Sequence, residues 1–426
     1  MTNLRTVKTK FFNFLVLCLI MIIVPTCLIS KTIEKSLIPK SYINASISSD
    51  SDNIESDFKA WLSSFKKTAI QKGISDITYD SATENITYNK KMIKFDRRQA
   101  EFTKQIWEYL DIAVSDLRVK NGKNSYFSNR ELLLKIEKKY DVDLKIVMGI
   151  WGLESAYGHR RGNINTIEAL ATLAFDGRRK TFFEEQLIAS LRILERGDTT
   201  LVAMQGSWAG AMGHTQFIPT SYLAYSEDFN GDGFADVWSD DPSDALASTA
   251  NYLNKHGWKR GQPWALEVIL PNDFDYLLLG KNNKNKVTYW DSIGVRQING
   301  DKLIDYGNSS IILPAGYKGP AFIIYDNFHV LEKYNASLAY VMGVGHLGDR
   351  IMGGQNFHKN WPKDEDALSL EEKKILQTYL LKEGYKIGKI DGMVGPNTIS
   401  AIRAYQNKLG KIPDGFATKS LLMKMQ

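Results

Sequence analysis

Cysteine is nearly absent from this chain of 426 residues. The only two, Cys18 and Cys27, lie within the first thirty positions, so the rest of the chain can form no disulfide, thiolate zinc site or thiol nucleophile. The six histidines are scattered and never show the HExxH spacing of zinc hydrolases. The body of the protein must therefore be stabilised by its hydrophobic core, and any chemistry needs other side chains.

Dense runs of lysine and arginine are also missing. The net charge is +6 and the pI about 8.9, without the basic clusters and interleaved aromatic residues that indicate nucleic-acid binding. We therefore expect no nucleic-acid partner, whereas an acidic polymer or an anionic surface is compatible with this charge. The length predicts two or three domains, and the 43% hydrophobic content is enough for a large core.

Residues 1–30 have the organisation of a signal sequence or an N-terminal anchor. Arg5, Lys8 and Lys10 precede a mostly apolar run over 11–29, which predicts export to the periplasm or cell envelope. The run is about long enough to remain as a membrane anchor. The stretch Val24-Pro-Thr-Cys27 is similar to a lipoprotein cleavage site, although its Pro and Thr depart from the usual small residues. Membrane contact is expected only here, and the polar residues 31–55 are predicted to be a tether.

Helical periodicity dominates the body of the chain. Apolar residues recur three and four positions apart, which predicts helices over 56–75, 102–117, 129–140, 163–196 and 328–352. The cluster Asn121-Gly-Lys-Asn124 is expected to break the chain between two of them. Between 262 and 328, β-prone runs separated by Gly, Asn and Pro predict a strand-rich insertion with strands over 266–270, 287–290, 311–313 and 321–325. The expected fold class is mainly α (α+β).

One predicted helix carries an acid on its apolar face. Over 143–158, Leu144, Val147, Met148 and Trp151 have helical spacing, Asp143 could cap the start, and Glu154 continues the apolar stripe. A carboxyl group in apolar surroundings has a raised pKa, and a protonated acid can donate to the leaving oxygen of a glycosidic bond. We interpret Glu154 as a general acid. The alternative is a structural Glu paired with a nearby Arg.

The segment 206–219 combines small and aromatic residues. Its glycines and alanines alternate with Trp208, Met212, Gln216 and Phe217. Glycines let a ligand or another backbone approach closely, while aromatic and amide groups suit sugar binding. A sugar-binding surface and a tight helix-packing seam are both compatible with this pattern.

Residues 228–236 resemble the first nine positions of an EF-hand loop. Asp228, Asn230 and Asp232 carry oxygen, and Phe234 offers its backbone carbonyl. The twelfth position would be Ser239 in place of the usual Glu, so Asp244 would have to fold back to complete a structural calcium site. A metal-free Asx/Gly turn is the alternative, and the acidic residues near the start of the next helix also suit its dipole.

The last sixty residues form a separate small unit. Residues 355–367 are polar and predicted to be an interdomain linker. Over 368–426, the capping box Ser369-Leu-Glu-Glu372 opens one helix, and two Asp-Gly turns precede two more. This three-helix unit carries no convincing set of acid and base groups.

Taken together, these motifs resemble a bacterial lytic murein transglycosylase of the B family over about 56–354, followed by a peptidoglycan-binding module over 368–426. The resemblance rests on motifs in the same order as in that family: Phe95-Asp-Arg-Arg-Gln-Ala-Glu-Phe102, Ile150-Trp-Gly-Leu-Glu-Ser-Ala-Tyr-Gly158, Ala169-Leu-Ala-Thr-Leu-Ala-Phe-Asp-Gly-Arg-Arg179, Gly206-Ser-Trp-Ala-Gly-Ala-Met-Gly213 and Gln216-Phe-Ile-Pro219. It implies a lysozyme-like helical catalytic domain that acts on peptidoglycan glycan strands as a monomer.

The same resemblance implies roles for individual residues. Glu154 would be the catalytic acid and base, and calcium would be held by the EF-hand-like loop with Asp244 as the distal carboxylate. The chemistry itself would need no cofactor. The glycan cleft would be lined by Arg178, Arg179, Ser207, Gln216, Tyr334 and Asn335.

By this resemblance, Glu154 would protonate the oxygen between N-acetylmuramic acid and N-acetylglucosamine and then deprotonate the C6 hydroxyl, which closes a 1,6-anhydro ring. A muramidase that uses water would need a second carboxylate, for which Asp176, Glu184 and Glu185 are the nearby candidates. A wall-binding protein with a structural Glu154 is the other alternative.

Overall fold

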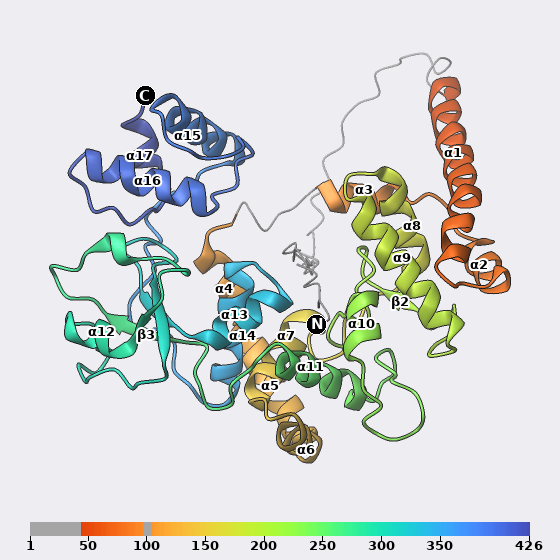
Figure 1. Cartoon of the computed structure of the whole chain (residues 1–426), viewed down its shortest axis with the longest axis horizontal. Coiled ribbons are helices and arrows are strands. Elements are labelled where there is room, and N and C mark those ends of the chain that lie inside the picture. Colours follow the sequence, from red (N-terminus) through yellow and green to blue (C-terminus); the bar gives the residue numbers. More distant parts are fainter. Residues whose placement is uncertain (1–43, 98–103) are drawn as a thin grey trace, which may run out of the picture. The chain divides into compact units, whose positions relative to one another are not determined.

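The computed structural model describes residues 44–97 and 104–426, with side chains from Asn53 onward (Figure 1). The predicted signal or anchor and the first part of the tether lie outside these residues. The described chain forms two compact units, one made of residues up to His159 and Leu246–Gln426, the other of residues up to 97 and Arg160–Ala245. No helix within the described ranges is long and apolar enough to cross a membrane.

Helices α7 (Leu144–Ser155) and α14 (Leu338–Ile351) are the centre of the first unit. Their backbones approach closely, because a Cβ atom at Gly149 would lie 2.3 Å from the Val344 carbonyl oxygen, and one at Gly348 would lie 2.3 Å from that of Lys145. Only glycine permits this contact. Around the pair lie α4 (Ile106–Ala113), α5 (Asp116–Ser128), α6 (Arg130–Tyr140) and α13 (Asp326–Tyr334).

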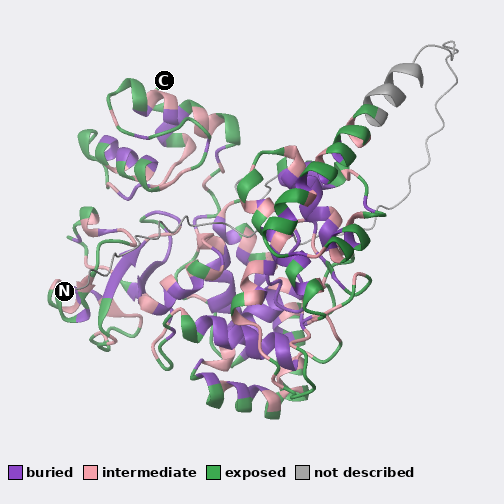
Figure 2. Cartoon of the chain, turned by 45° about the vertical axis from the view of Figure 1, so that its right-hand side comes forward, coloured by how far each residue is buried: buried purple, intermediate pink, exposed green. Residues whose placement is uncertain are grey.

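The strand-rich insertion also belongs to the first unit. Its antiparallel sheet has the order β4-β6-β7-β3-β5, and its core includes Val268, Trp290, Ile311 and Ile323. Figure 2 shows buried residues along these strands. The sheet is made of β3 (Ala265–Ile269), β4 (Asn285–Lys286), β5 (Arg296–Gln297), β6 (Asn308–Ile312) and β7 (Ala321–Ile324).

The second unit is a helical layer built around α8 (Thr166–Asp176) and α9 (Lys180–Glu195). Asn165 caps α8, since its side chain accepts from the Glu168 amide at 3.1 Å. The other elements are α1 (Asn44–Gln71), α2 (Asp76–Thr83), α3 (Lys90–Arg97), α10 (Pro219–Tyr225) and the short β1 (Ile164–Asn165) and β2 (Gln205–Gly206). Helix α11 (Ser243–Lys255) begins in this unit and continues in the first.

The C-terminal module has the three expected helices, α15 (Leu370–Lys382), α16 (Pro396–Lys408) and α17 (Lys419–Met423), around its own core. The predicted capping box is present, with Ser369 and Glu372 exchanging hydrogen bonds. The polar segment 355–367 is packed: Phe357 contacts the Phe322 ring edge to face, and Glu267 accepts from the backbone amides of residues 358 and 359.

Three local predictions were wrong. Residues 121–124 do not break the chain but lie inside α5, because Gly122 gives room to the Tyr157 hydroxyl and the Ile351 side chain. Residues 287–290 belong to the short helix α12 (Val287–Ser292), which buries Val287 and Trp290 on one face. Residues 44–55 of the predicted tether are helical in α1.

The start of α7 differs in detail from the prediction. Asp143 precedes the helix but makes no capping hydrogen bond with its side chain. Its carboxylate accepts from Trp258 Nε1 at 2.8 Å instead, and Glu137 Oε1 accepts from the Leu144 amide at 3.1 Å. The free amide at this helix end is therefore satisfied by a residue of the preceding helix.

Candidate active site

Glu154 lies in the last turn of α7 and is half-buried. The helix ends sharply after it, since Ala156 and Tyr157 both have left-handed backbones, with φ of 51° and 60°. Such conformations are costly for residues with a Cβ atom. Here they are held by the Tyr157 hydroxyl, which donates to the Arg118 carbonyl at 2.9 Å, and by Ser155 Oγ, which accepts from the Gly158 amide at 2.8 Å.

Tyr340 fixes one oxygen of the Glu154 carboxyl group. Its hydroxyl donates to Glu154 Oε1 at 2.6 Å from the first turn of α14. Ser337 caps that turn by accepting from the Tyr340 amide at 3.4 Å, and Asn335 Oδ1 accepts from the Ser337 amide at 3.0 Å. The Tyr334 ring is stacked on the Tyr340 ring at 6.3 Å. Tyr334 and Asn335, predicted from the sequence, thus lie beside the tyrosine that contacts Glu154.

Arg178 and Arg179 occupy the turn between α8 and α9 in the second unit. Both are bonded to Asp96, whose side chain is only 1% exposed. Arg178 Nε donates to Asp96 Oδ2 at 2.5 Å, and its Nη2 donates to the Asp96 carbonyl at 2.9 Å. Hydrogen bonding to Asp96 raises the pKa of Arg178, whereas burial lowers the pKa of Arg179, which lies over the Phe183 ring. Arginine stays charged under either shift.

Ser207 and Gln216 tie down the Gly-rich loop of the second unit. Ser207 Oγ accepts from the Ala211 amide at 3.1 Å. Gln216 is buried with φ of 56°, and its Nε2 donates to the backbone carbonyls of Arg161 and Gly213, both at 2.9 Å. The glycines serve close packing, because a Cβ atom at Gly213 would lie 2.1 Å from the Val237 carbonyl oxygen. The packing interpretation therefore accounts for these glycines.

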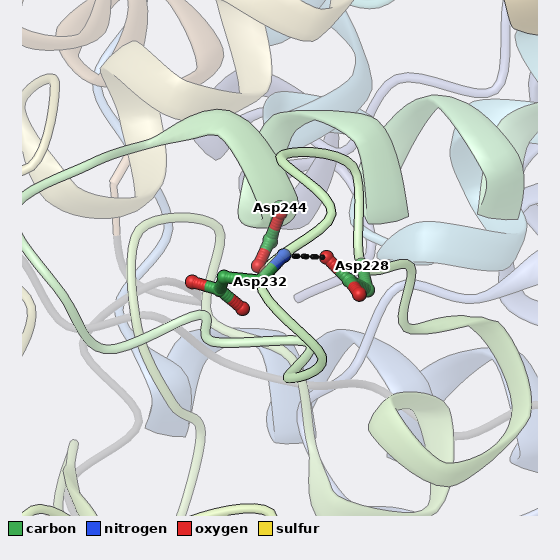
Figure 3. A group of neighbouring side chains, drawn as sticks. All are labelled: Asp228, Asp232 and Asp244. Carbon is green, nitrogen blue, oxygen red and sulfur yellow. Dashed lines mark hydrogen bonds between the residues drawn. The ribbon is translucent and has the colours of Figure 1, made fainter.

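Three carboxylates of the EF-hand-like loop gather at the start of α11. Ligand oxygens of Asp228, Asp232 and Asp244 lie within 4.8 Å of one another (Figure 3). Asp244 is buried, which raises the pKa of its carboxyl group, and it accepts from the backbone amides of Phe229, Asn230 and Asp236. An all-oxygen set of this kind fits the donors that calcium prefers.

The loop also has the features of an Asx turn. Asp228 Oδ1 accepts from the Gly231 amide at 2.7 Å and from the Asp232 amide at 3.2 Å, and Asn230 Oδ1 accepts from the Asp232 amide at 3.0 Å. The Phe234 side chain is exposed. The sequence left open whether Asp244 reaches the loop; the helix start does bring it there.

Two residues with a clear position in these sites were not singled out from the sequence. Tyr340 is 186 positions from Glu154, and only its place three residues after a Ser that can cap a helix signals a fixed orientation. Asp96 lies in a motif used for the resemblance, yet its pairing with Arg178 and Arg179 depends on α3 packing beside α8. Of the carboxylates considered for a water-activating role, Asp176 is paired with Arg97 at 2.7 Å and Glu184 lies 3.8 Å from Lys180.

The family follows from comparison with known proteins. Residues 57–349 match the family model described as the transglycosylase SLT domain, which is more than half of the chain. Residues 369–425 match a peptidoglycan binding domain. The chain belongs to the transglycosylase SLT domain family, as the ordered motifs predicted.

Individual relatives agree with this assignment. Membrane-bound lytic murein transglycosylase B of Escherichia coli (strain K12) is 32% identical over 240 residues, which cover 55% of this chain and 63% of that protein. The aligned part is thus somewhat less than two thirds of the relative's length.

Solved structures resemble a larger part of the chain. SltB3 from Pseudomonas aeruginosa, in complex with NAG-anhNAM-pentapeptide, is 43% identical with a TM-score of 0.83 and covers 86% of this chain and 99% of its own. Escherichia coli Slt35 in complex with calcium is 25% identical with a TM-score of 0.60 and covers 70% and 93%. These matches confirm the predicted fold class, a mainly helical, lysozyme-like domain with a few strands.

Proposed function

We propose that this protein is a lytic transglycosylase that cleaves the MurNAc-GlcNAc bond of peptidoglycan and leaves 1,6-anhydromuramic acid ends. The observation that carries the proposal is Glu154, held at the end of α7 by the Tyr340 hydroxyl at 2.6 Å within the region that matches the family. The relative SltB3 has been solved with a ligand that contains anhNAM, which supports the anhydro product.

In this reaction Glu154 acts first as acid and then as base. Because Oε1 accepts from Tyr340, the proton for transfer is carried on Oε2 and passes to the glycosidic oxygen as the bond to C1 breaks. The N-acetyl oxygen of the substrate stabilises the positive charge at C1, so that no second carboxylate is needed. The ionised Glu154 then takes the proton of the C6 hydroxyl, whose oxygen bonds to C1 and closes the ring.

The remaining assignments belong to the same proposal. The C-terminal module binds the cell wall, and residues 1–30 export the protein to the periplasm or cell envelope as a cleaved signal, a retained anchor or a lipidated terminus. The protein acts as a monomer. The glycan strand is contacted by Arg178, Arg179, Ser207, Gln216, Tyr334 and Asn335.

We also propose a structural calcium ion at the loop 228–236. Its ligands would be the side chains of Asp228, Asn230, Asp232 and Asp244 with the carbonyl of Phe234. The three clustered carboxylates and the calcium complex of Slt35 support it. The ion would stabilise the loop, and all proton transfers stay with Glu154.

Mass spectrometry of purified sacculi digested by the full-length protein tests the activity. Wild type should release muropeptides with anhydro ends, and Glu154→Gln should lower the release by about 1,000-fold or more, as expected for loss of the only acid and base. Glu184→Gln should be unchanged. Reducing ends would indicate a muramidase, and full release by Glu154→Gln would favour a wall-binding role.

A further inference from the structure

A charged cluster surrounds Asp96 in the second unit. Arg178 and Arg179 both bond to its buried carboxylate, and the neighbouring Arg97 is paired with Asp176 at 2.7 Å. Three guanidinium groups thus face two carboxylates, which leaves one positive charge. The Asp96 and Asp176 side chains are 1% and 9% exposed, whereas Arg97 is 63% and Arg178 41% exposed. The negative charges lie inside and the positive charges lie at the surface.

This arrangement favours an anionic ligand. The fork of Arg178 is fixed by two bonds, one to the Asp96 side chain and one to its carbonyl. A fixed guanidinium group recognises carboxylates well, because little side-chain entropy is lost on binding. The proposed glycan backbone of N-acetylated sugars is neutral, so it has no need of such a charge. The peptide stems of peptidoglycan, in contrast, end in free carboxylates.

We propose that the cluster Arg97, Arg178 and Arg179 binds a carboxylate of the peptide stem, and that Asp96 is the positioning residue that orients Arg178 and Arg179. The inference rests on the proposed action on peptidoglycan and adds a stem-binding site to it. Enzyme that carries this site binds stem-bearing strands more tightly than bare ones.

The experiment compares two soluble substrates of matched chain length: glycan strands that carry their stems, and the same strands stripped of stems by an amidase. Full-length Arg178→Ala should raise KM for stem-bearing strands by about tenfold or more, since a charge-assisted contact is lost. Its kcat should stay within about twofold, and KM for stripped strands should not change. Arg196→Ala, which removes another surface Arg–Asp pair of the same unit, should behave as wild type.

Asp96→Asn tests the positioning role, because it keeps the shape and removes the charge that holds both arginines. It should raise KM for stem-bearing strands selectively, and the KM of wild type on those strands should rise with salt. Arg178→Lys, which leaves the buried carboxylate intact and keeps a cation, should give a smaller selective rise, and it decides the outcome if Asp96→Asn unfolds.

Equal effects of Arg178→Ala and Arg178→Lys on both substrates, or no effect on either, would overturn the stem site. The products distinguish this from failure of the proposed function. Anhydro ends from wild type on both substrates keep the transglycosylase assignment even if the stem site is refuted.

Discussion

The bond between Tyr340 and Glu154 makes a quantitative prediction. Tyr340→Phe removes the hydroxyl that donates to Glu154 Oε1 at 2.6 Å and keeps the ring that stacks on Tyr334. A hydrogen bond to a charged group contributes about 1.5–3 kcal/mol. If this energy is realised only when Glu154 carries charge during the reaction, kcat should fall about 10- to 100-fold with KM within about threefold.

The measurement is steady-state cleavage of soluble glycan strands by the full-length protein, with anhydro products counted by mass spectrometry. Tyr79→Phe is the matched control. It removes a buried tyrosine hydroxyl that donates to the Leu62 carbonyl, also at 2.6 Å, and should lower stability without changing kcat. A Tyr340→Phe enzyme with kcat within about twofold of wild type would refute the orienting role of this bond.

Two further predictions concern stability. His346 is 7% exposed and stacked on Phe357 at 3.9 Å, and burial lowers its pKa to about 4; since the unfolded chain takes up this proton near pH 6.5, the associated stability is present above that pH and lost as the pH falls toward 4. Denaturant unfolding at pH 7 and 4.5 should therefore show an acid loss about 2 kcal/mol smaller in His346→Asn than in wild type, and an equal loss would contradict the buried neutral histidine. Calcium at about 100 times its Kd should stabilise the second unit by about 2.7 kcal/mol, seen as a higher Tm that Asp232→Asn lacks while its Tm in chelator matches wild type; no shift in wild type would favour the metal-free turn.

Much of the fold could be predicted because local patterns and packing agree. The stripe of Val147, Met148 and Trp151 predicted α7 and directed Glu154 toward the core, and the structure has that helix with Glu154 half-buried. Ser369 and Glu372 likewise form the predicted capping box. In these places the residues that determine the element lie within one or two turns of one another, so the sequence contains the whole signal.

The errors arose where a distant contact determines the local structure. Gly122 reads as a helix breaker, yet it lies in α5 because Tyr157 and Ile351 fill the space that a side chain would occupy. Residues 287–290 are β-prone, but Val287 and Trp290 both face the insertion core only when they are three apart on a helix. Tertiary packing overrides propensity in both cases.

The interactions around the candidate site residues were predicted least well. The spacing of Glu154 says nothing about Tyr340, which lies on another helix 186 positions away. The pairing of Asp96 with the two arginines also joins separate helices. Such pairs depend on which helix faces pack together, and a single sequence does not encode that in its periodicity.

The glycines between α7 and α14 have a consequence for motion. Because Gly149 and Gly348 bring the two backbones into direct contact, Glu154 and Tyr340 stand on one rigid block. Surface segments can therefore open or close around an incoming sugar chain without lengthening the bond between acid and donor. Only sliding of one helix along the other would part them, and that movement would break the contacts at the centre of the unit.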